Sequence, residues 1–191
     1  MSVLNIVTPE ENEPALRVQT EPIKNFKAPE LQKLIDDMID TMRDKEGVGL
    51  AAPQVGLKHR LAVVETLPEY DDEGEPIEGT RDLYVIVNPE IIWRSRKEVS
   101  GVEGCLSIPG YLGEVWRHHS VTVRAYDRHG KRKRFRLKGW DARIFQHEID
   151  HLDGVLYTDK LTAPENYWTE EEYEKMREEE EAAEAEVQKA R

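Results

Sequence analysis

The sequence contains, late in the chain, the stretch Gln146-His147-Glu148-Ile149-Asp150-His151-Leu152. Around it, apolar residues recur at spacings of three, four and three, at Ala142, Phe145, Ile149 and Leu152. That period predicts a helix over about residues 141–153 that buries one face. His147 and His151 flank this face, so the helix directs two imidazoles toward the interior, where buried polar groups need partners.

The two histidines have the spacing of a metal site. They are four residues apart, so their side chains project from one face of the helix, one turn apart. Glu148 follows the first histidine, where a carboxylate could hold or deprotonate a water on the metal; this is the His-Glu-x-x-His pattern of zinc hydrolases. The same pattern arises by chance on charged helices, and the histidines would then be partly exposed members of a polar stripe.

The third ligand is less obvious than the first two. One protease motif extends to a further histidine, but this chain has Tyr157 at that position, and the other four histidines have no ligand spacing to each other. Cys105 remains as a candidate. A lone cysteine is most often a small buried hydrophobe, yet this one lies between Gly104 and a turn predicted at Pro109-Gly110, where the backbone can approach a ligand. Two imidazoles and one thiolate would leave the fourth position of a catalytic metal open.

The rest of the pattern predicts an α+β fold, with antiparallel or mixed strands around the metal-binding helix that contains His-Glu-x-x-His. An early amphipathic helix is expected over about residues 29–46, stopped by Gly47, and an acidic loop over residues 69–81. Strands are expected at residues 61–64, 84–87, 99–105 and 121–126 and before residue 116.

The charge of the chain is concentrated near its end. The 191 residues have a formal net charge of −12, and residues 170–191 contribute ten Glu against four Lys and Arg, a charge of −6. Thr169 and Glu172 fit a capping box at the start of a helix that has almost no aliphatic side chains. We therefore expect a catalytic domain over residues 1–168 and an exposed acidic helix over residues 169–191. A partner-docking tail is the alternative.

A second charged segment is basic. Residues 128–138 contain seven Lys and Arg and follow an alternating strand, so they predict a hairpin whose turn spans residues 127–131. The simplest interpretation is a solvated face. The alternative is an RNA-contacting patch, which no interleaved aromatic residue supports. The overall acidic charge argues against stable nucleic-acid binding.

Cysteine content and hydropathy indicate the cellular compartment of the protein. A single cysteine excludes an intramolecular disulfide and favours a reducing compartment. No signal peptide and no apolar window long enough to span a membrane are visible. The sequence thus predicts a cytoplasmic protein without membrane association.

Three segments together resemble the motifs of peptide deformylases, in order and at the usual separations, over about residues 4–161. They are Gly47-Val48-Gly49-Leu50-Ala51-Ala52-Pro53-Gln54, Glu103-Gly104-Cys105-Leu106-Ser107 and Gln146-His147-Glu148-Ile149-Asp150-His151-Leu152. The resemblance implies removal of the N-formyl group from nascent chains that begin with formylmethionine, with release of formate. It also implies Cys105, His147 and His151 as metal ligands.

Further roles follow from the same resemblance. Glu148 would act as general base and then acid on a water whose pKa the metal lowers. The Gln54 side-chain amide and the Leu106 backbone N–H would stabilise the oxyanion. Residues implied in substrate binding are Val48, Gly49 and Gly104, in loops along the peptide backbone, and Ile144, in the methionine pocket.

The resemblance implies Fe²⁺ as the metal in the cell, with Ni²⁺ or Co²⁺ as active substitutes, although a Cys-His-His site also binds Zn²⁺ readily. A monomer is expected, with transient ribosome contact through the basic hairpin at residues 128–138. Sequence order further suggests that Glu103 and Arg117 form a charge pair that braces the Cys105 segment. Two rival interpretations remain: a zinc endopeptidase, and a catalytically silent relative that only binds peptides.

Overall fold

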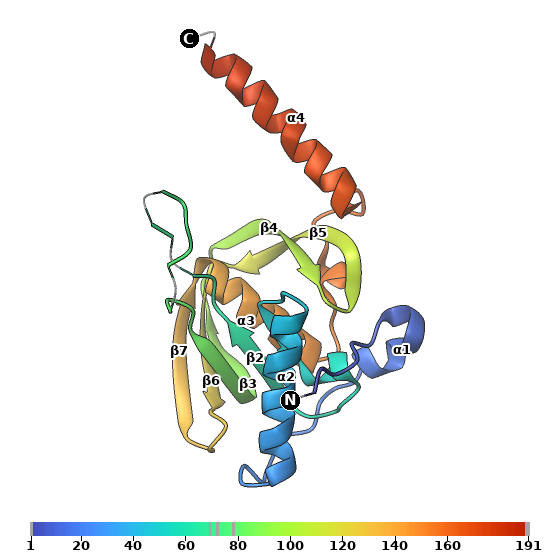
Figure 1. Ribbon diagram of the computed structural model, residues 1–191, viewed down its shortest axis with the longest axis vertical. Coiled ribbons are helices and arrows are strands. Elements are labelled where there is room, and N and C mark those ends of the chain that lie inside the picture. Colours follow the sequence, from blue (N-terminus) through green and yellow to red (C-terminus); the bar gives the residue numbers. More distant parts are fainter. Residues whose placement is uncertain (1, 69, 72, 78, 190–191) are drawn as a thin grey trace.

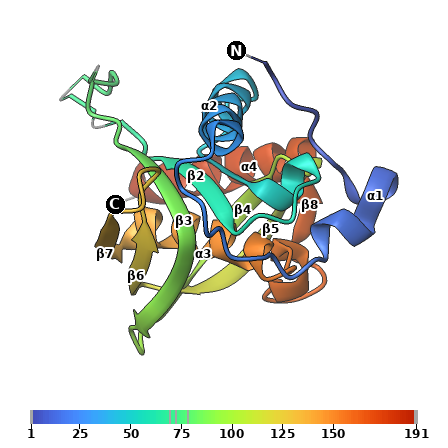
Figure 2. The same cartoon turned by 90° about the horizontal axis from the view of Figure 1, so that it is seen from below.

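Two antiparallel sheets contact helix α3 (Gly139–Leu152), the helix with the two histidines (Figures 1 and 2). The computed structural model describes residues 2–68, 70–71, 73–77 and 79–189. The first sheet has the order β1 (Gly49–Ala51), β2 (Leu61–Glu65), β3 (Leu83–Arg94), β6 (Ser120–Tyr126), β7 (Arg132–Lys138). The second has the order β4 (Glu98–Cys105), β5 (Ile108–His118), β8 (Tyr167–Thr169). The predicted α+β class with antiparallel strands is confirmed, because every pairing between these strands is antiparallel.

The remaining elements are helical. They are α1 (Pro9–Leu16), α2 (Pro29–Asp44), α4 (Glu170–Lys189) and two short 3₁₀ turns at Ala52–Val55 and Tyr157–Lys160. No helix in the described ranges is long and apolar enough to cross a membrane.

The core forms on both faces of the first sheet, and β2 shows why. Its side chains alternate: Ala62 and Val64 join the cluster that contains α3, whereas Leu61 and Val63 join the cluster that contains α2. A strand covered on both faces needs a continuous apolar run, which residues 61–64 provide. This packing fixes α3 against the sheet and so determines where its histidines lie.

Helix α2 ends two residues before its predicted boundary. Its last turn closes in a Schellman motif, in which the N–H of Glu46 donates to Arg43 (3.1 Å) and the N–H of Gly47 donates to Met42 (2.8 Å). Glu46 therefore occupies the left-handed position, with φ 54°. Gly47 is needed for space instead, because a Cβ there would lie 2.9 Å from Leu106.

Helix α4 begins with the predicted capping box and extends away from the rest of the molecule (Figure 1). The Glu172 carboxylate accepts from the Thr169 N–H at 2.8 Å, and the Thr169 hydroxyl accepts from the Glu172 N–H at 3.2 Å. Its described side chains are exposed apart from Tyr173, which is half-buried.

The basic segment forms the predicted hairpin between β6 and β7. Its turn closes with the Asp127 N–H donating to the Lys131 carbonyl at 2.9 Å, and β7 lies at the edge of the sheet. Along β7 the exposed residues are Arg132, Arg134, Arg136 and Lys138. Of the predicted acidic loop at 69–81, residues 69, 72 and 78 lie outside the described part of the chain, and the other residues connect β2 to β3.

Candidate metal centre and active site

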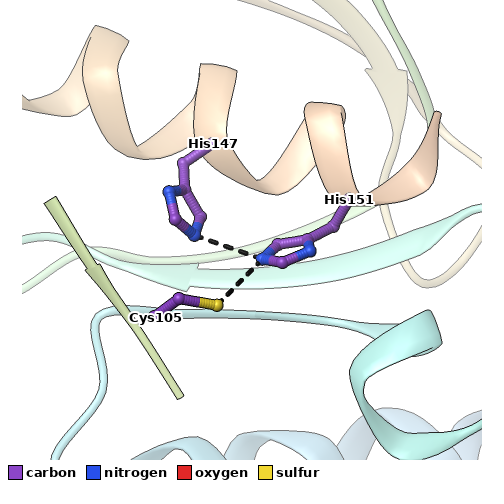
Figure 3. Close-up of side chains that lie close together, drawn as sticks. All are labelled: Cys105, His147 and His151. Atoms are coloured by element: carbon purple, nitrogen blue, oxygen red, sulfur yellow. Dashed lines mark hydrogen bonds between the residues drawn. The ribbon is translucent and has the colours of Figure 1, made fainter. Parts of the chain in front are cut away.

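The structure brings Cys105, His147 and His151 together, as Figure 3 shows. The Nε2 atoms of the two histidines are 3.2 Å apart, and the Cys105 sulfur lies 3.3 Å from His151 Nε2. His147 and His151 are buried on α3, and burial, with the nearby charges of His147 and Arg117, lowers the pKa of His151 well below its usual value. Burial alone would lower the pKa of His147 too, but its hydrogen bonds to Cys105 and Glu103 outweigh burial and raise it well above its usual value. A metal binds the neutral form of each imidazole, so binding would displace the extra proton of His147.

The hairpin of β4 and β5 supplies the cysteine, and its geometry corrects one prediction. The chain reverses at Leu106 and Ser107, because Cys105 pairs directly with Ile108. Pro109 and Gly110 lie in β5, at an irregularity of its pairing, with Gly110 at φ 78°. The tight reversal, rather than a Pro-Gly turn, directs the thiol toward α3.

The three donor atoms fit a tetrahedral ion. Zinc-like bond lengths of about 2.3 Å to sulfur and about 2.0–2.1 Å to nitrogen require about 3.3 Å between nitrogens and about 3.5 Å between sulfur and nitrogen. The observed separations of 3.2 and 3.3 Å approach these values, and all three donors lie within 4.8 Å of one another. Three protein donors leave one coordination position for water or substrate.

A buried ion network holds His147 in place. Its Nδ1 lies 2.9 Å from a Glu103 oxygen, an arrangement that directs the opposite nitrogen, Nε2, toward the other donors. Arg117 donates twice to Glu103, at 2.8 and 2.9 Å, which confirms the predicted pair. Burial alone would raise the pKa of Glu103, but the hydrogen bonds from Arg117 and His147 outweigh it and hold that pKa well below its usual range.

The sequence did not suggest that Arg143 and Asp150 belong to this network. Arg143 donates to Glu103 at 2.8 Å and to the Val99 carbonyl at 2.9 Å, and Asp150 pairs with Arg117. The glycine at position 101 was a possible sequence signal for Arg143. Any larger residue there would collide with the guanidinium, because a Cβ at Gly101 would lie 2.8 Å from it. That signal can be interpreted only after the strand and helix are packed together.

We expect Arg117→Leu to lower the free energy of unfolding by about 3–5 kcal/mol, because it leaves Glu103 buried with fewer cationic partners. Urea unfolding at a fixed metal concentration measures the loss. The matched control is Arg124→Leu, which breaks an exposed pair with Glu90 and should cost less than about 1 kcal/mol. Equal losses in the two variants would contradict a structural role for the network.

Gln54 uses the two ends of its side-chain amide differently. Its side-chain oxygen accepts from the Ala51 N–H at 2.8 Å, which caps the turn after β1. The amide nitrogen must then face the other way, and it lies 3.4 Å from the Cys105 sulfur and 3.4 Å from the Ser107 hydroxyl. The cap therefore aims an N–H donor at the metal centre.

A cavity of about 220 Å³ opens onto these groups. Its lining includes Gln54, Glu103, Cys105, Leu106, His147, Glu148 and the four predicted substrate residues Val48, Gly49, Gly104 and Ile144. His151 lies outside the lining. The lining also includes Trp140, Arg143 and Glu46, which the sequence did not single out.

Two of the substrate residues were expected in loops but lie in strands. Gly49 belongs to β1 and Gly104 to β4, and only Val48 precedes its strand. β1 and β4 are edge strands, each paired on one side only. An edge leaves backbone groups available to an extended ligand, so it can bind a peptide as the expected loop would.

Glu148 is a buried carboxylate of the cavity wall. Burial raises its pKa to about 7, and its Oε2 is one of two buried side-chain atoms without a hydrogen-bond partner in the described residues, the other being His151 Nδ1. Gly49 makes room for it, because a Cβ at that position would lie 2.2 Å from Glu148 Oε1. A carboxylate oxygen is thus free to accept a proton beside the three metal donors.

A family model, related sequences and solved structures all identify the same family for this chain. The family model described as polypeptide deformylase matches residues 3–167. The peptide deformylase of Symbiobacterium thermophilum is 49% identical over 164 residues, covering 85% of this chain and 68% of that protein. The crystal structure of peptide deformylase from Thermus thermophilus superposes with a TM-score of 0.73 at 39% identity, covering 86% of this chain and 89% of that one. A structure titled Met-ala-ser bound class I type b peptide deformylase from Acinetobacter baumannii gives 0.74 at 34% identity, covering 84% and 100%. The chain therefore belongs to the polypeptide deformylase family.

Proposed function

We propose that this chain removes the N-formyl group from newly synthesised polypeptides that begin with formylmethionine, releasing formate. The observation that carries the proposal is the group of Cys105, His147 and His151, two of which line a cavity together with Glu148. The cavity lies between two sheet edges. A divalent metal held by these three residues supplies Lewis acidity and activates water. The family is metal-dependent, and this donor set suits such an ion.

Glu148 moves the proton in this mechanism. Its free carboxylate oxygen accepts the proton of the attacking water, and the resulting acid donates it to the amine that leaves as the formyl C–N bond breaks. Its burial excludes bulk water, so the proton stays in the site until the amine takes it.

Gln54 and Leu106 stabilise the negative oxygen that develops on the formyl group. The Gln54 amide is aimed at the metal centre by its capping bond to Ala51. The Leu106 N–H belongs to the tight reversal beside Cys105, in the cavity lining. Both donors are neutral and held in position before the reaction, which is the arrangement that stabilises an oxyanion most effectively.

We expect Gln54→Glu to reduce kcat by about 10²–10³ with little change in KM, because a carboxylate keeps the cap but replaces the donor with a negative charge. Steady-state formate release measures the effect. Gln32→Glu is the control, since that amide bonds to the Phe26 and Arg128 carbonyls away from the cavity. An unchanged kcat in Gln54→Glu would remove Gln54 from the mechanism.

The substrate backbone extends between the edges of β1 and β4, along Val48, Gly49 and Gly104. An extended peptide added to a sheet edge gains main-chain hydrogen bonds, and its alternate side chains enter pockets. The first side chain enters the cavity against Ile144. The Met-ala-ser complex of the Acinetobacter baumannii relative supports a peptide of this chemistry in this family.

We propose Fe²⁺ as the metal in the cell, with Zn²⁺, Ni²⁺ or Co²⁺ able to occupy the same donors in purified protein. A reduced cytoplasm preserves both the thiolate and ferrous iron, so we propose a cytoplasmic location. Metal analysis of anaerobically purified, active protein should find iron; a fully active zinc enzyme would contradict this assignment.

We also propose a catalytic domain over residues 1–168, an appended acidic helix over 169–191, and a monomeric enzyme that touches the ribosome through the hairpin at residues 128–138. Arg132, Arg134, Arg136 and Lys138 are exposed on its edge strand, whereas α4 would be repelled by RNA.

Co-sedimentation with ribosomes at low salt tests the proposed contact. Charge reversal of Arg134 and Arg136 should abolish co-sedimentation, because it replaces two cationic contacts with repulsion. Removal of residues 170–191 should leave it intact. The opposite pattern would assign the contact to α4.

A further inference from the structure

Tyr157 is buried beside the metal centre but supplies no donor atom to it. It occupies the position at which the longer protease motif would place a third histidine, and it begins the 3₁₀ turn at Tyr157–Lys160. Its side chain is 1% exposed, yet it is not among the residues that line the catalytic cavity. It also belongs to neither of the two hydrophobic clusters that pack on the first sheet, so filling that core does not explain its burial.

The Tyr157 ring stacks on the imidazole of His147. The two ring centroids are 6.1 Å apart and the ring planes differ by 23°, which is an offset stacked arrangement. The hydrogen bond between Nδ1 and Glu103, at 2.9 Å, is a second contact that orients the same imidazole. One hydrogen bond leaves a ring free to tilt about the bonded nitrogen, so a flat neighbour is needed to fix its plane. Glu103 therefore sets the direction of the imidazole, and Tyr157 sets the plane in which Nε2 points at the other donors.

The Tyr157 ring is itself anchored to β5. Its hydroxyl donates to the Tyr111 carbonyl at 3.1 Å. Gly113, two residues further along β5, leaves room for the ring, because a Cβ there would lie 3.0 Å from Tyr157 Cε2. β5 pairs with β4, the strand that ends at Cys105. Tyr157 thus links His147, which is on α3, to the hairpin that carries Cys105.

We infer that Tyr157 is a positioning residue, which holds the His147 ring in the plane that metal binding requires and fixes it relative to the Cys105 hairpin. The inference rests on the metal centre of the proposed function. Groups that orient a metal ligand without binding the metal typically contribute about tenfold to a hundredfold to metal affinity. The stack acts on one of three ligands, so its loss should weaken the site without abolishing it.

Release of Co²⁺ from the loaded protein to a chelator, together with the visible absorption spectrum of the bound Co²⁺, tests this role. Tyr157→Leu removes the ring and should release Co²⁺ about tenfold to a hundredfold faster than the wild type, with a shifted spectrum, because the imidazole can tilt. Tyr157→Phe keeps the ring and loses only the hydrogen bond to Tyr111. It should keep the wild-type spectrum and release Co²⁺ within about threefold of the wild-type rate.

Tyr84→Leu is the matched control. Tyr84 packs against Phe145 of α3, with ring centroids 5.5 Å apart, and its hydroxyl donates to Asp82 at 3.1 Å. Its loss also removes a ring from the helix with the two histidines, but this contact is with an apolar residue rather than a metal donor. Spectrum and release rate should stay at the wild-type values. If Tyr157→Leu does not fold, Tyr157→Met takes its place, because an unbranched side chain fills space without a flat face.

A wild-type spectrum and release rate in the variant without the ring would overturn the inference. So would the same change in Tyr157→Phe or in Tyr84→Leu, because the cause would then lie outside the stack. Failure of the wild type to bind Co²⁺ would instead overturn the metal centre of the proposed function. Absence of formate release with intact Co²⁺ binding would overturn the proposed function alone, and the Co²⁺ measurements would still decide the role of Tyr157.

Discussion

Cys105→Ala is expected to lose its bound metal and to release formate at least about a thousandfold more slowly than the wild type. The thiolate is the one anionic donor of the proposed trio, and its removal leaves two neutral imidazoles 3.2 Å apart. Cys105 ends strand β4, whose pairing with β5 uses backbone groups, so the fold should survive the change. Metal stoichiometry after dialysis and formate release are the two measurements.

Cys105→Asp is the informative companion to this variant. A carboxylate at the same position restores an anionic donor, although a harder one, and should recover part of the metal content. Ser107→Ala changes a neighbouring residue in the chain reversal at Leu106 and Ser107. It should keep the metal, which would show that metal loss is specific to Cys105. Full metal occupancy in Cys105→Ala would show that the ligands are other residues.

Glu148→Ala is expected to keep its metal, while its kcat falls by a factor of about 10²–10⁴. Glu148 is adjacent in sequence to His147, a proposed ligand, but contributes no donor atom to the trio, so metal content separates the two proposed roles. Its loss removes the group that takes the proton from water and returns it to the amine. Parallel measurements of metal content and kcat test both halves of the prediction.

Two further variants sharpen the test of Glu148. Gly49→Ala leaves the carboxylate in place but forces it aside, since the new Cβ would lie 2.2 Å from Glu148 Oε1, and it should also lower kcat. Asp141→Ala removes a carboxylate from the first turn of the same helix and should leave kcat unchanged, because Asp141 does not line the cavity. Wild-type turnover by Glu148→Ala would exclude it as the proton carrier.

The features that the sequence predicted correctly depend on short-range geometry. The spacing of His147 and His151 translates directly into neighbouring side chains because a helix has a fixed period. The capping box at Thr169 works in the same way, and residues 121–126 form the predicted strand, although Thr122 is buried there like Val121 and Val123. The sequence also suggested the pair of Glu103 and Arg117, although no local period encodes it: Arg117 pairs in register with Val99, and Glu103 with Gly113.

Of the features that the sequence did not predict, one depends on long-range packing and two depend on local backbone geometry. Arg143 meets Glu103 across 40 positions of sequence, and no local period encodes that contact. The reversal at Leu106 and Ser107 contains neither Gly nor Pro, so turn chemistry favoured the wrong site two residues later. Glu46 adopts φ 54° where glycine would be expected, because the Schellman motif places the left-handed residue one position before Gly47.

Formate release from formyl-Met-Ala-Ser by anaerobically purified enzyme distinguishes a deformylase from an endopeptidase and from a silent peptide binder. Glu148→Ala is the inactive reference, and a peptide with an acetylated N-terminus is the competing substrate. We expect the wild type to release one formate per peptide consumed, Glu148→Ala to release almost none, and the acetylated peptide to remain uncleaved. Cleavage of internal bonds without formate, as expected of a zinc endopeptidase, or peptide binding without any turnover, would contradict the proposed function.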